Sequence, residues 1–449
     1  MSERLQGLLQ PVGRPRGGVP AEHRKNTAAS PVRDIATPPE VVIPLAQHIG
    51  APCKPTVKKG DVVSIGDVIG DSDAPLSAPI HASISGTVKD IREITTSANI
   101  RCQAVVIQSD GEDRYTDTIE PPKVNDKQSL VAAARKSGLV GLGGAGFPTH
   151  FKLNTPESTD VDTLIINGAE CEPYVTVDHR MMLEKTESIF PALDLIVEYL
   201  GIKKVILGIE DNKPDAIEKV MAAADKHNGP VKVEVMTLPA HYPQGAEKII
   251  VQSATGRLIP PGKLPLDVGC IVMNVTSVIF LTDYLATGRP LTYRSMTIDG
   301  GAIKDPQNIR VPLGTPISFI AEQVGGFKAD PYRVLMGGPM MGIALDDLDT
   351  PVIKNNNAIT FLVEDDIILK QERNCIRCNR CHVVCPLNLM PMKYLVGAQY
   401  QDLEMLGPTG YDVMVCMECG CCSYECPSGI PLLQHIRYGK ALLQKGAKN

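Results

Sequence analysis

The sequence contains no tryptophan, and aromatic residues make up 4% of its 449 residues. It also lacks a long apolar run. The most apolar stretches, Val268–Thr282 and Leu193–Ile209, are short or interrupted by charged residues, whereas a membrane-spanning helix needs about 20 apolar residues. A net charge of −6 and a pI near 5.9 lack the basic excess typical of nucleic-acid-binding proteins. The sequence therefore predicts neither a membrane span nor a nucleic-acid partner.

The first residues, MSERLQGLLQPVGRPRGG, lack the apolar core and cleavage site of a signal peptide, so export is not predicted. A hydrophobic content of 43% with 21% charged residues is typical of a globular protein, and the length exceeds that of one ordinary domain. Nine of the thirteen cysteines lie between Cys375 and Cys426. In a chain that is not exported, such crowding indicates metal ligands rather than disulfides.

The first 120 residues predict a small β domain. They are rich in Gly, Pro and Val and contain short alternating runs at Asp61–Ile65 and Thr87–Ile91. The segment HIGAPCKPTVKKGDVVSIGDVIG resembles the barrel-sandwich hairpins of biotinyl and lipoyl domains. At the expected hairpin tip, Asp71–Pro79 contains no lysine that could carry a swinging cofactor. A docking or structural module is therefore favoured.

Three further regions follow, and together they predict a multidomain α/β protein. Residues 121–289 alternate between helical and strand patterns, which is typical of a sheet with crossover helices. The expected helices are Ser129–Ser137, Asp178–Leu200 and Lys213–His227, and the expected strands are Thr163–Asn167, Val205–Ile209 and Val231–Met236. Residues 290–350 read as a small β-rich module with Gly-rich turns. Residues 365–449 read as mainly helical, including the segments Leu387–Met405 and Leu432–Gln444.

The cysteines of the last region form two C-x₂-C-x₂-C-x₃-C-P motifs. In this spacing three thiolates hold one [4Fe–4S] cluster and the fourth cysteine reaches the other cluster. The predicted ligands are Cys375, Cys378, Cys381 and Cys426 for cluster 1, and Cys385, Cys416, Cys419 and Cys422 for cluster 2. Structural zinc, the alternative, normally takes two C-x₂-C pairs rather than triplets followed by Cys-Pro. Cys421 is expected to pack beside cluster 2 without binding it.

A glycine-rich loop upstream, GLGGAGFPTHFKL, matches G-x-G-x-x-G at Gly141, Gly143 and Gly146. A Rossmann site is disfavoured because a helix, not a strand, precedes the loop and a proline follows it. The remaining alternatives are a surface on which another cofactor lies close to the backbone and a turn without a ligand.

The segment NGAECEPYVTVDHR begins at the end of an expected strand, where α/β sheets place ligands. Its polar residues Asn167, Glu170 and Glu172 are of a kind that binds ribityl hydroxyls, flavin edges or nicotinamide groups. A surface loop is the alternative for each of them taken singly. Cys171, between the two glutamates, is expected to be a small packed residue.

These motifs, together with HYPQGAEK and the sequences CIRCNRCHVVCPLNLMP and CMECGCCSYECPSGIPL, make nearly the whole chain resemble the C subunits of the Rnf complex, the ferredoxin:NAD oxidoreductase of bacterial membranes. The middle of the chain also resembles the flavin-binding subunit of respiratory complex I, with Leu142 and Ala246 where that subunit has arginine and glutamate. The resemblance implies FMN and NAD(H) in residues 121–289. It also implies a β-grasp fold for residues 290–350, and a peripheral place on the cytoplasmic side of the membrane beside the other Rnf subunits, through which ferredoxin is reached.

The same resemblance implies which residues surround the flavin and NADH. The residues next to the flavin phosphate and ribityl chain would be Gly141, Gly143, Gly144, Gly146 and Lys152. The residues lining the flavin and NADH pocket would be Asn167, Glu170, Glu172, Tyr242, Gly245, Glu247 and Asn274. No catalytic acid or base is expected, because hydride transfer between stacked rings depends on placement.

Three alternatives to the Rnf interpretation stay open at this point. One is the flavin and iron–sulfur cobalamin reductase of microcompartments, which resembles the same family. The second is a non-catalytic relay that carries clusters but neither flavin nor NADH. The third is a cluster-bearing scaffold whose β modules dock other subunits.

Overall fold

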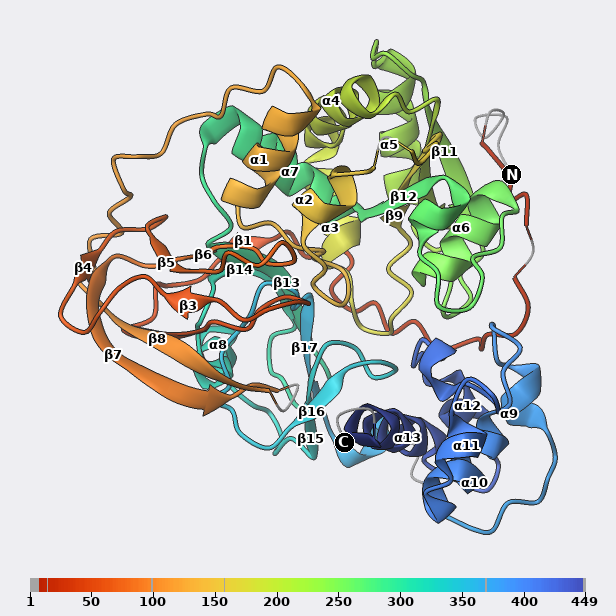
Figure 1. The fold of residues 1–449 in the computed structure, drawn as a ribbon. Helices are drawn as coiled ribbons and strands as arrows, with labels where there is room; N and C mark the ends of the chain where they lie inside the picture. Colours follow the sequence, from red (N-terminus) through yellow and green to blue (C-terminus); the bar gives the residue numbers. More distant parts are fainter. Residues whose placement is uncertain (1–7, 14, 98–99, 157, 368–369, 447–449) are drawn as a thin grey trace.

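The computed structural model describes residues 8–13, 15–97, 100–156, 158–367 and 370–446. Its four parts are a β barrel, an α/β domain, a second sheet and a helical C-terminal domain, which lies at the lower right in Figure 1. The predicted multidomain α/β fold is confirmed. Within the described ranges, no helix has the length and apolar character needed to cross a membrane.

The barrel is built from two small sheets, in the strand orders β2-β8-β7-β4 and β3-β5-β6. Its strands are β2 Glu40–Pro44, β3 Lys54–Pro55, β4 Val62–Val63, β5 Val68–Asp71, β6 Ile80–His81, β7 Gly86–Thr95 and β8 Arg101–Ser109. Alternating apolar residues of both sheets, among them Ile43, Ile69 and Ile107, form one buried core. The predicted short strands near residues 61–65 and 87–91 are confirmed.

The central domain contains a four-stranded parallel sheet in the order β11-β10-β9-β12. Its strands are β9 Thr163–Gly168, β10 Lys204–Glu210, β11 Val233–Leu238 and β12 Cys270–Asn274. Its helices are α1 Lys127–Lys136, α2 Thr149–Leu153, α3 Val177–Glu184, η2 Thr186–Ile189, α4 Phe190–Leu200, α5 Pro214–Lys226, α6 Glu247–Thr255, η3 Pro265–Val268 and α7 Val275–Thr287. Alternate strand residues pack on opposite faces, Ile165 toward α6 and Leu164 toward the larger helix layer. Both faces are covered, as a parallel sheet requires.

One predicted helix of this domain is wrong. The segment Asp178–Leu200 forms three pieces, α3, η2 and α4, rather than one helix. Pro191 lies in the first turn of α4, where its missing N–H is tolerated, but it could not donate within a continuous helix. Thr186 also donates its hydroxyl to the Met182 carbonyl at the end of α3. The other predicted strands and helices of the domain are confirmed within a few residues.

The second sheet has six strands in the order β1-β14-β13-β17-β15-β16. They are β1 Arg33–Asp34, β13 Tyr293–Asp299, β14 Gln307–Pro312, β15 Arg333–Met336, β16 Ile343–Leu345 and β17 Ala358–Leu362, with helix α8 Ile317–Gln323 and the short turn η4 Glu364–Asp366. Strand β1 comes from a segment far earlier in the chain. Strand β17 lies between β13 and β15, so the sheet extends to Leu362.

The C-terminal domain is helical. Its elements are α9 Arg380–Val383, α10 Pro391–Tyr400, α11 Leu403–Leu406, η5 Val413–Val415, α12 Cys421–Glu425 and α13 Leu432–Gly446. Helices α10 and α13 pack through Tyr394 and Ile436, and the helix predicted at Leu432–Gln444 is confirmed. The helix predicted over Leu387–Met405 is instead divided, because Gln401 adopts a left-handed conformation (φ 53°) that ends α10.

Residues 8–13 and 15–30, called here the N-terminal strap, run outside the barrel between the central domain and the C-terminal domain (Figure 1). Leu9 pairs with Met236 on β11, and Val19 pairs with Tyr242. The Gly18 amide donates to the Val384 carbonyl at 2.8 Å. A side chain on Gly17 would place Cβ 2.6 Å from that carbonyl oxygen, so only glycine allows this close approach.

Candidate functional site

The glycine loop lies beside the end of β12 and the start of α7. The Leu142 amide donates to the hydroxyl of Ser277 at 3.0 Å. A Cβ on Gly143 would lie 2.6 Å from Nδ2 of Asn274, the residue that caps α7. A Cβ on Gly144 would meet no protein atom within 4 Å. The exposed middle of the loop therefore leaves open space directly over the backbone, as a bound flavin requires.

Residues from three parts of the molecule hold this loop in place. Arg294 of β13 is buried and donates to the Leu142 carbonyl at 3.1 Å. Asn355 donates to the Gly144 carbonyl at 3.1 Å. The amide of Ile49, from the barrel, donates to the Gly146 carbonyl at 3.2 Å. The loop is thus preorganised by contacts that the sequence motifs do not contain.

Polar side chains surround the open space. Asn167 and Asn274 are register partners at the ends of β9 and β12. Asn167 donates to the Gly245 carbonyl at 2.8 Å, and the Lys152 ammonium lies 2.8 Å from Glu247. The structure thus brings together nine of the predicted residues, Gly141, Gly143, Gly144, Gly146, Lys152, Asn167, Gly245, Glu247 and Asn274. They combine backbone amides, two carboxamides and one cation, Lys152, which is paired with the carboxylate of Glu247. The amides, the carboxamides and the cation suit a phosphate and a polyhydroxyl chain.

The other three predicted residues have partners outside this space. The Glu170 carboxylate accepts from the backbone amides of Asp178 and His179 at the start of α3. Burial raises the pKa of Glu170 to about 7, and the nearby Lys25 ammonium opposes this rise. Glu170 therefore stabilises the N-terminus of a helix.

Glu172 points toward the second sheet. Its two oxygens accept from the amides of Met340 and Met341 at 3.0 and 2.8 Å. Burial raises the pKa of Glu172 to about 7, while these two amides favour the ionised form. Glu172 thus joins the loop after β9 to the loop between β15 and β16.

Tyr242 joins the central domain to the cysteine motifs. It is buried, and its hydroxyl donates to the Cys419 carbonyl at 2.7 Å. Three residues later, Gly245 accepts from Asn167. One short segment therefore contacts both the glycine-loop site and the second cysteine motif.

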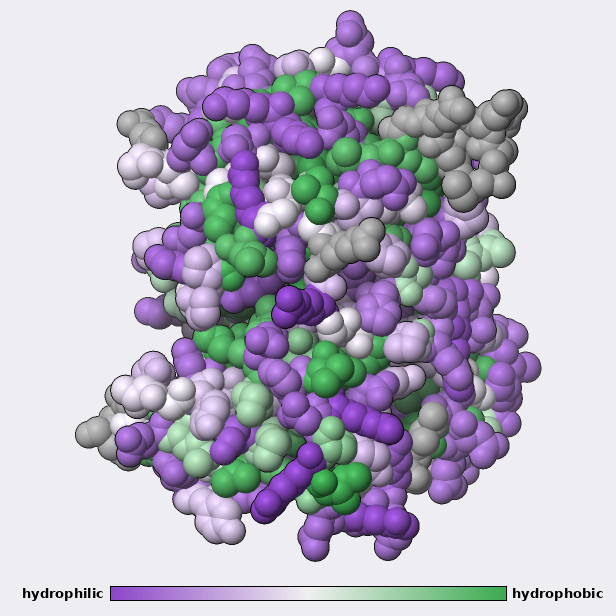
Figure 2. Space-filling view, turned by 90° about the vertical axis from the view of Figure 1, so that its right-hand side faces the viewer, coloured by the Kyte–Doolittle hydropathy of each residue, from purple (hydrophilic) through white to green (hydrophobic). Residues whose placement is uncertain are grey.

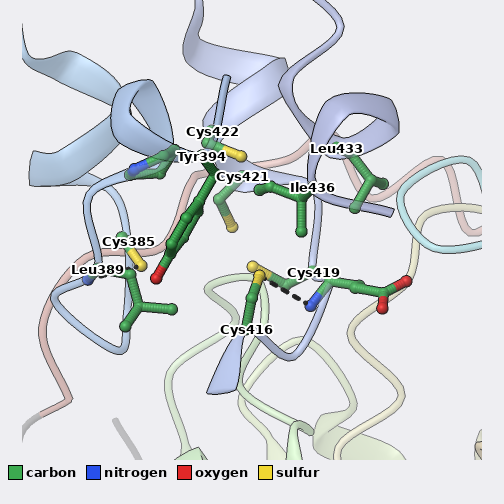
Figure 3. A pocket seen from close by; sticks show the side chains of 12 residues that line it. Cys385, Leu389, Tyr394, Cys416, Cys419, Cys421, Cys422, Leu433 and Ile436 are labelled. Carbon is green, nitrogen blue, oxygen red and sulfur yellow. Dashed lines mark hydrogen bonds between the residues drawn. The ribbon is translucent and has the colours of Figure 1, made fainter. Parts of the chain in front are cut away.

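The cysteines surround two separate cavities. The first, with about 320 Å³ of unfilled space that is partly open to solvent, is lined by Cys385, Cys416, Cys419, Cys421 and Cys422 (Figure 3). Backbone amides of Leu389 and Glu418 donate to the sulfurs of Cys385 and Cys416, and Figure 3 marks the second contact. Burial raises the pKa of the Cys416 thiol to about 11, so the buried thiolates of this site need a positively charged partner such as iron.

The second cavity, with about 400 Å³ of unfilled space on the same measure, is lined by Cys375, Cys378, Cys381 and Cys426. Each cavity thus takes three cysteines from one motif and the fourth from the other, the division that the spacing predicts. Equivalent residues of the two motifs, Arg377 with Glu418 and Asn379 with Gly420, all have φ between 56° and 81°. The two loops therefore share one backbone conformation, and both donor sets fit a cubane.

Sequence reasoning missed several residues of the site. The buried carboxylate of Asp178 accepts from Asn274 at 2.7 Å and from Thr276. Arg294 and Asn355 hold the glycine loop from outside the central domain. Asp178 lies in the segment NGAECEPYVTVDHR, so its position shortly after a strand could have indicated a role in the site. Arg294 and Asn355 carry no such local signal.

Each part of the chain matches a known family. Residues 14–112 match the family described as RnfC barrel sandwich hybrid domain, and residues 134–283 match the Nuo51 FMN-binding domain. Residues 296–344 match the SLBB domain, and residues 374–430 match the 4Fe-4S dicluster domain. The parts of this chain are therefore those of proteins that bind FMN and two [4Fe–4S] clusters.

Curated relatives match along most of their length. The C subunit of the proton-translocating ferredoxin:NAD(+) oxidoreductase complex of Clostridium ljungdahlii is 43% identical over 95% of this chain and 93% of its own. The Na(+)-translocating counterpart of Acetobacterium woodii is 40% identical over 87% of this chain and 88% of its own length. The C subunit of the ion-translocating oxidoreductase complex of Rhodobacter capsulatus is 37% identical over 96% of this chain and 83% of its own length. The chain belongs to the family of C subunits of these ion-translocating ferredoxin:NAD⁺ oxidoreductase complexes, the Rnf complexes.

Proposed function

We propose that this protein passes electrons between NAD(H), FMN and two [4Fe–4S] clusters as a subunit of an ion-translocating ferredoxin:NAD⁺ oxidoreductase. The segment Tyr242–Glu247 carries this proposal. It contacts Asn167 beside the glycine loop and Cys419 in the second cysteine motif. The flavin site and cluster 2 would thus lie on either side of one short segment, of which Tyr242, Pro243 and Gln244 are buried.

The chain's own residues position the cofactors. FMN, when bound, exchanges two electrons with NAD(H) and single electrons with a cluster. The glycine loop and Lys152 would receive the flavin phosphate and ribityl chain, and Asn167, Asn274 and Gly245 would face the ring. Three predicted residues would not contact the cofactor directly. They would stabilise the loops around the site through their own hydrogen bonds; these residues are Glu170, Glu172 and Tyr242.

The cysteine ligands are proposed as the two crossed sets. Cluster 1 would be held by Cys375, Cys378, Cys381 and Cys426, and cluster 2 by Cys385, Cys416, Cys419 and Cys422. Cys421 lines the same cavity as cluster 2, but it lies outside the repeated spacing. We therefore treat it as a packed neighbour.

The protein's place follows from its family. We propose that it lies peripherally on the cytoplasmic side of the membrane, bound to the other subunits of the complex, through which ferredoxin is reached. The four domains would divide near residues 120, 289 and 365, with the SLBB β-grasp module third. The β barrel would serve as a docking module, since Asp71–Pro79 contains no lysine.

The test is to purify the full chain without oxygen, reconstitute clusters and FMN, and add NADH. Flavin bleaching followed by the electron paramagnetic resonance of reduced clusters is expected. Iron and sulfide near eight each, as two cubanes require, with no flavin bound and no response to NADH, would instead indicate a relay. The cobalamin reductase alternative is not favoured, because the relatives described above are subunits of ion-translocating complexes.

A further inference from the structure

The two cysteine motifs share a backbone conformation but differ in their surroundings. In the first motif Cys378 is exposed. Figure 2 faces the side of the molecule on which α9 lies, and hydrophilic residues cover most of the surface there. In the second motif the equivalent residue, Cys419, is buried in a cluster with Val19, Tyr242 and Cys421. One motif therefore faces water, whereas the other packs against the central domain and the N-terminal strap.

Tyr242 contributes a polar group to this apolar cluster. Its side chain is buried, with 3% of the residue exposed, and its hydroxyl donates to the Cys419 carbonyl at 2.7 Å. Phenylalanine would fill nearly the same volume, so the hydroxyl adds a hydrogen bond rather than packing. The carbonyl belongs to the peptide bond that directly follows a predicted ligand of cluster 2. The hydroxyl dipole is therefore fixed beside the predicted cluster site.

The backbone holds Tyr242 in this position. Its N–H donates to the Val19 carbonyl at 3.1 Å, and its carbonyl accepts from the Val19 N–H at 2.8 Å. Three residues later, the Gly245 carbonyl accepts from Asn167 beside the glycine loop at 2.8 Å. A dipole that the fold holds in place acts on a nearby charge without having to reorient.

We propose that Tyr242 is a positioning residue whose hydroxyl raises the reduction potential of cluster 2 and so favours electron transfer to this cluster from the flavin. The proposal rests on the proposed function and goes beyond it. Reduction adds one electron to cluster 2, supplied by the reduced flavin, and the phenol keeps its proton throughout. Cluster 1, whose site is exposed at Cys378, is outside the reach of this hydroxyl.

The sign of the effect follows from the direction of the hydrogen bond. The hydroxyl points its hydrogen, the positive end of the dipole, toward the loop that would hold the cluster. Reduction adds a negative charge there, so the dipole favours the reduced form, and the potentials of such clusters respond to hydrogen bonds and to solvent exposure. Burial acts in the opposite direction, because apolar surroundings disfavour the added charge. Tyr242 would thus offset part of the effect of burying cluster 2.

The experiment measures the potentials of both clusters in the full chain. Dithionite and redox mediators set the ambient potential, and electron paramagnetic resonance follows each cluster. The signal of cluster 2 is identified by its absence in Cys419→Ser. The test variant is Tyr242→Phe, which keeps the ring and removes the hydroxyl. The matched control is Tyr284→Phe, because Tyr284 is a buried tyrosine of α7, 2% exposed, that lines neither cysteine cavity.

Tyr242→Phe is expected to keep the full iron and sulfide content and to lower the potential of cluster 2. At a given ambient potential its reduced-to-oxidised ratio would fall by about threefold, or ~28 mV at about 59 mV per tenfold change. The potential of cluster 1, and both potentials in Tyr284→Phe, are expected to stay unchanged. A ring-fluorinated tyrosine in place of Tyr242 is a stronger donor and is expected to raise the potential of cluster 2.

An unchanged potential of cluster 2 in Tyr242→Phe, with full iron content, would overturn the proposal. An equal shift of both clusters would also overturn it, since that would indicate a general change of the fold. Weaker FMN binding with an unchanged potential would instead assign Tyr242 to the flavin pocket. If Tyr242→Phe loses cluster 2, the fluorinated protein decides, and an unchanged potential there would reject the role. The titration needs neither NADH nor FMN, so a failure of the proposed function, seen as no flavin bleaching by NADH, is recorded separately.

Discussion

Two adjacent residues of the glycine loop, Gly143 and Gly144, have different surroundings, so substitutions there can separate effects on protein stability from effects on FMN binding. Gly144→Ala adds a methyl group into space without protein atoms, whereas Gly143→Ala pushes against Asn274. Gly144→Ala is expected to leave the melting temperature of the flavin-free protein unchanged and to weaken FMN binding by at least about tenfold, or ~1.4 kcal/mol. Fluorescence titration with FMN measures this.

Gly143→Ala serves as the comparison for that measurement. It is expected to lower the melting temperature of the flavin-free protein as well, because Asn274 caps α7 and loss of such a cap costs about 1 kcal/mol. Unchanged FMN affinity in Gly144→Ala would show that the flavin does not lie against this part of the loop.

Cys419 and Cys421 are both buried beside the first cavity, but only Cys419 belongs to the repeated spacing. Cys419→Ser is expected to remove the cluster 2 signal from the electron paramagnetic resonance spectrum and to lower the iron content. Cys421→Ser is expected to keep the full iron and sulfide content, since a packed thiol is not a ligand. A cluster lost in Cys421→Ser and retained in Cys419→Ser would reverse the assignment.

At the scale of elements, the N-terminal strap holds the loop that follows β9. The Lys25 ammonium donates to the carbonyls of Glu170, Glu172 and Val175 at 2.8, 2.8 and 2.6 Å, which uses all three of its N–H donors. Replacement of Lys25 by methionine would leave these carbonyls without their donor. The loss of folding stability would be about 1–3 kcal/mol for each carbonyl that stays buried. The strap therefore stabilises the polar loop through its backbone, while the loop's own side chains contact α3 and the second sheet.

In Lys25→Met, amide hydrogen exchange of residues 168–176 is expected to speed up by at least about tenfold, while exchange in the barrel stays unchanged. Exchange measured by mass spectrometry on peptides covers both regions. Arg16→Gln is the control, because Arg16 lies on the same strap and is exposed. Equal protection in Lys25→Met and the unchanged protein would contradict a supporting role for the strap.

At the scale of the whole molecule, Lys354 lies where the barrel, the central domain and the second sheet meet. It is fully buried and donates to the carbonyls of Pro79 and Gly138 at 2.6 and 2.7 Å. Burial lowers the pKa of Lys354 to about 7. The neutral amine of Lys354 still has two N–H donors, one for each of these two carbonyls.

This burial predicts a pH-dependent stability. Between about pH 7 and pH 10.4 the unfolded chain keeps the Lys354 proton and the folded protein releases it, so the unfolded state binds more protons and stability rises with pH. Relative to Lys354→Met, the unchanged protein is expected to gain up to ~1.4 kcal/mol per pH unit in this window. The contribution is lost as pH falls toward 7.

Thermal unfolding of both proteins at about pH 7 and about pH 9 measures this difference. A separation between the two melting temperatures that widens with pH is expected. Equal changes of the two melting temperatures with pH would contradict this prediction. They would show that Lys354 keeps its proton in the folded protein and does not cause the pH dependence of stability.

The sequence by itself determined the features that depend on neighbouring residues. The cysteines of the two motifs line two cavities in the crossed arrangement that the spacing predicts, because the reach of each side chain follows from its spacing within one turn. The division of these cysteines into two ligand sets stays a prediction. The parallel strands and most helices follow from local apolar periodicity. The helix predicted at Asp178–Leu200 failed because Pro191 interrupts the backbone hydrogen bonds without disturbing the apolar pattern.

Only the tertiary structure decided which polar residues lie beside the glycine loop and which contact other parts of the fold. Glu172 and Tyr242 were expected in the pocket, yet they contact Met340 and Cys419, residues 168 and 177 positions further along the chain. Lys354 reaches Pro79 over 275 residues. Such partners are set by the packing of whole domains, so no local pattern specifies them. The spacing of the cysteines thus revealed what the protein carries, and the packing revealed how its domains are joined.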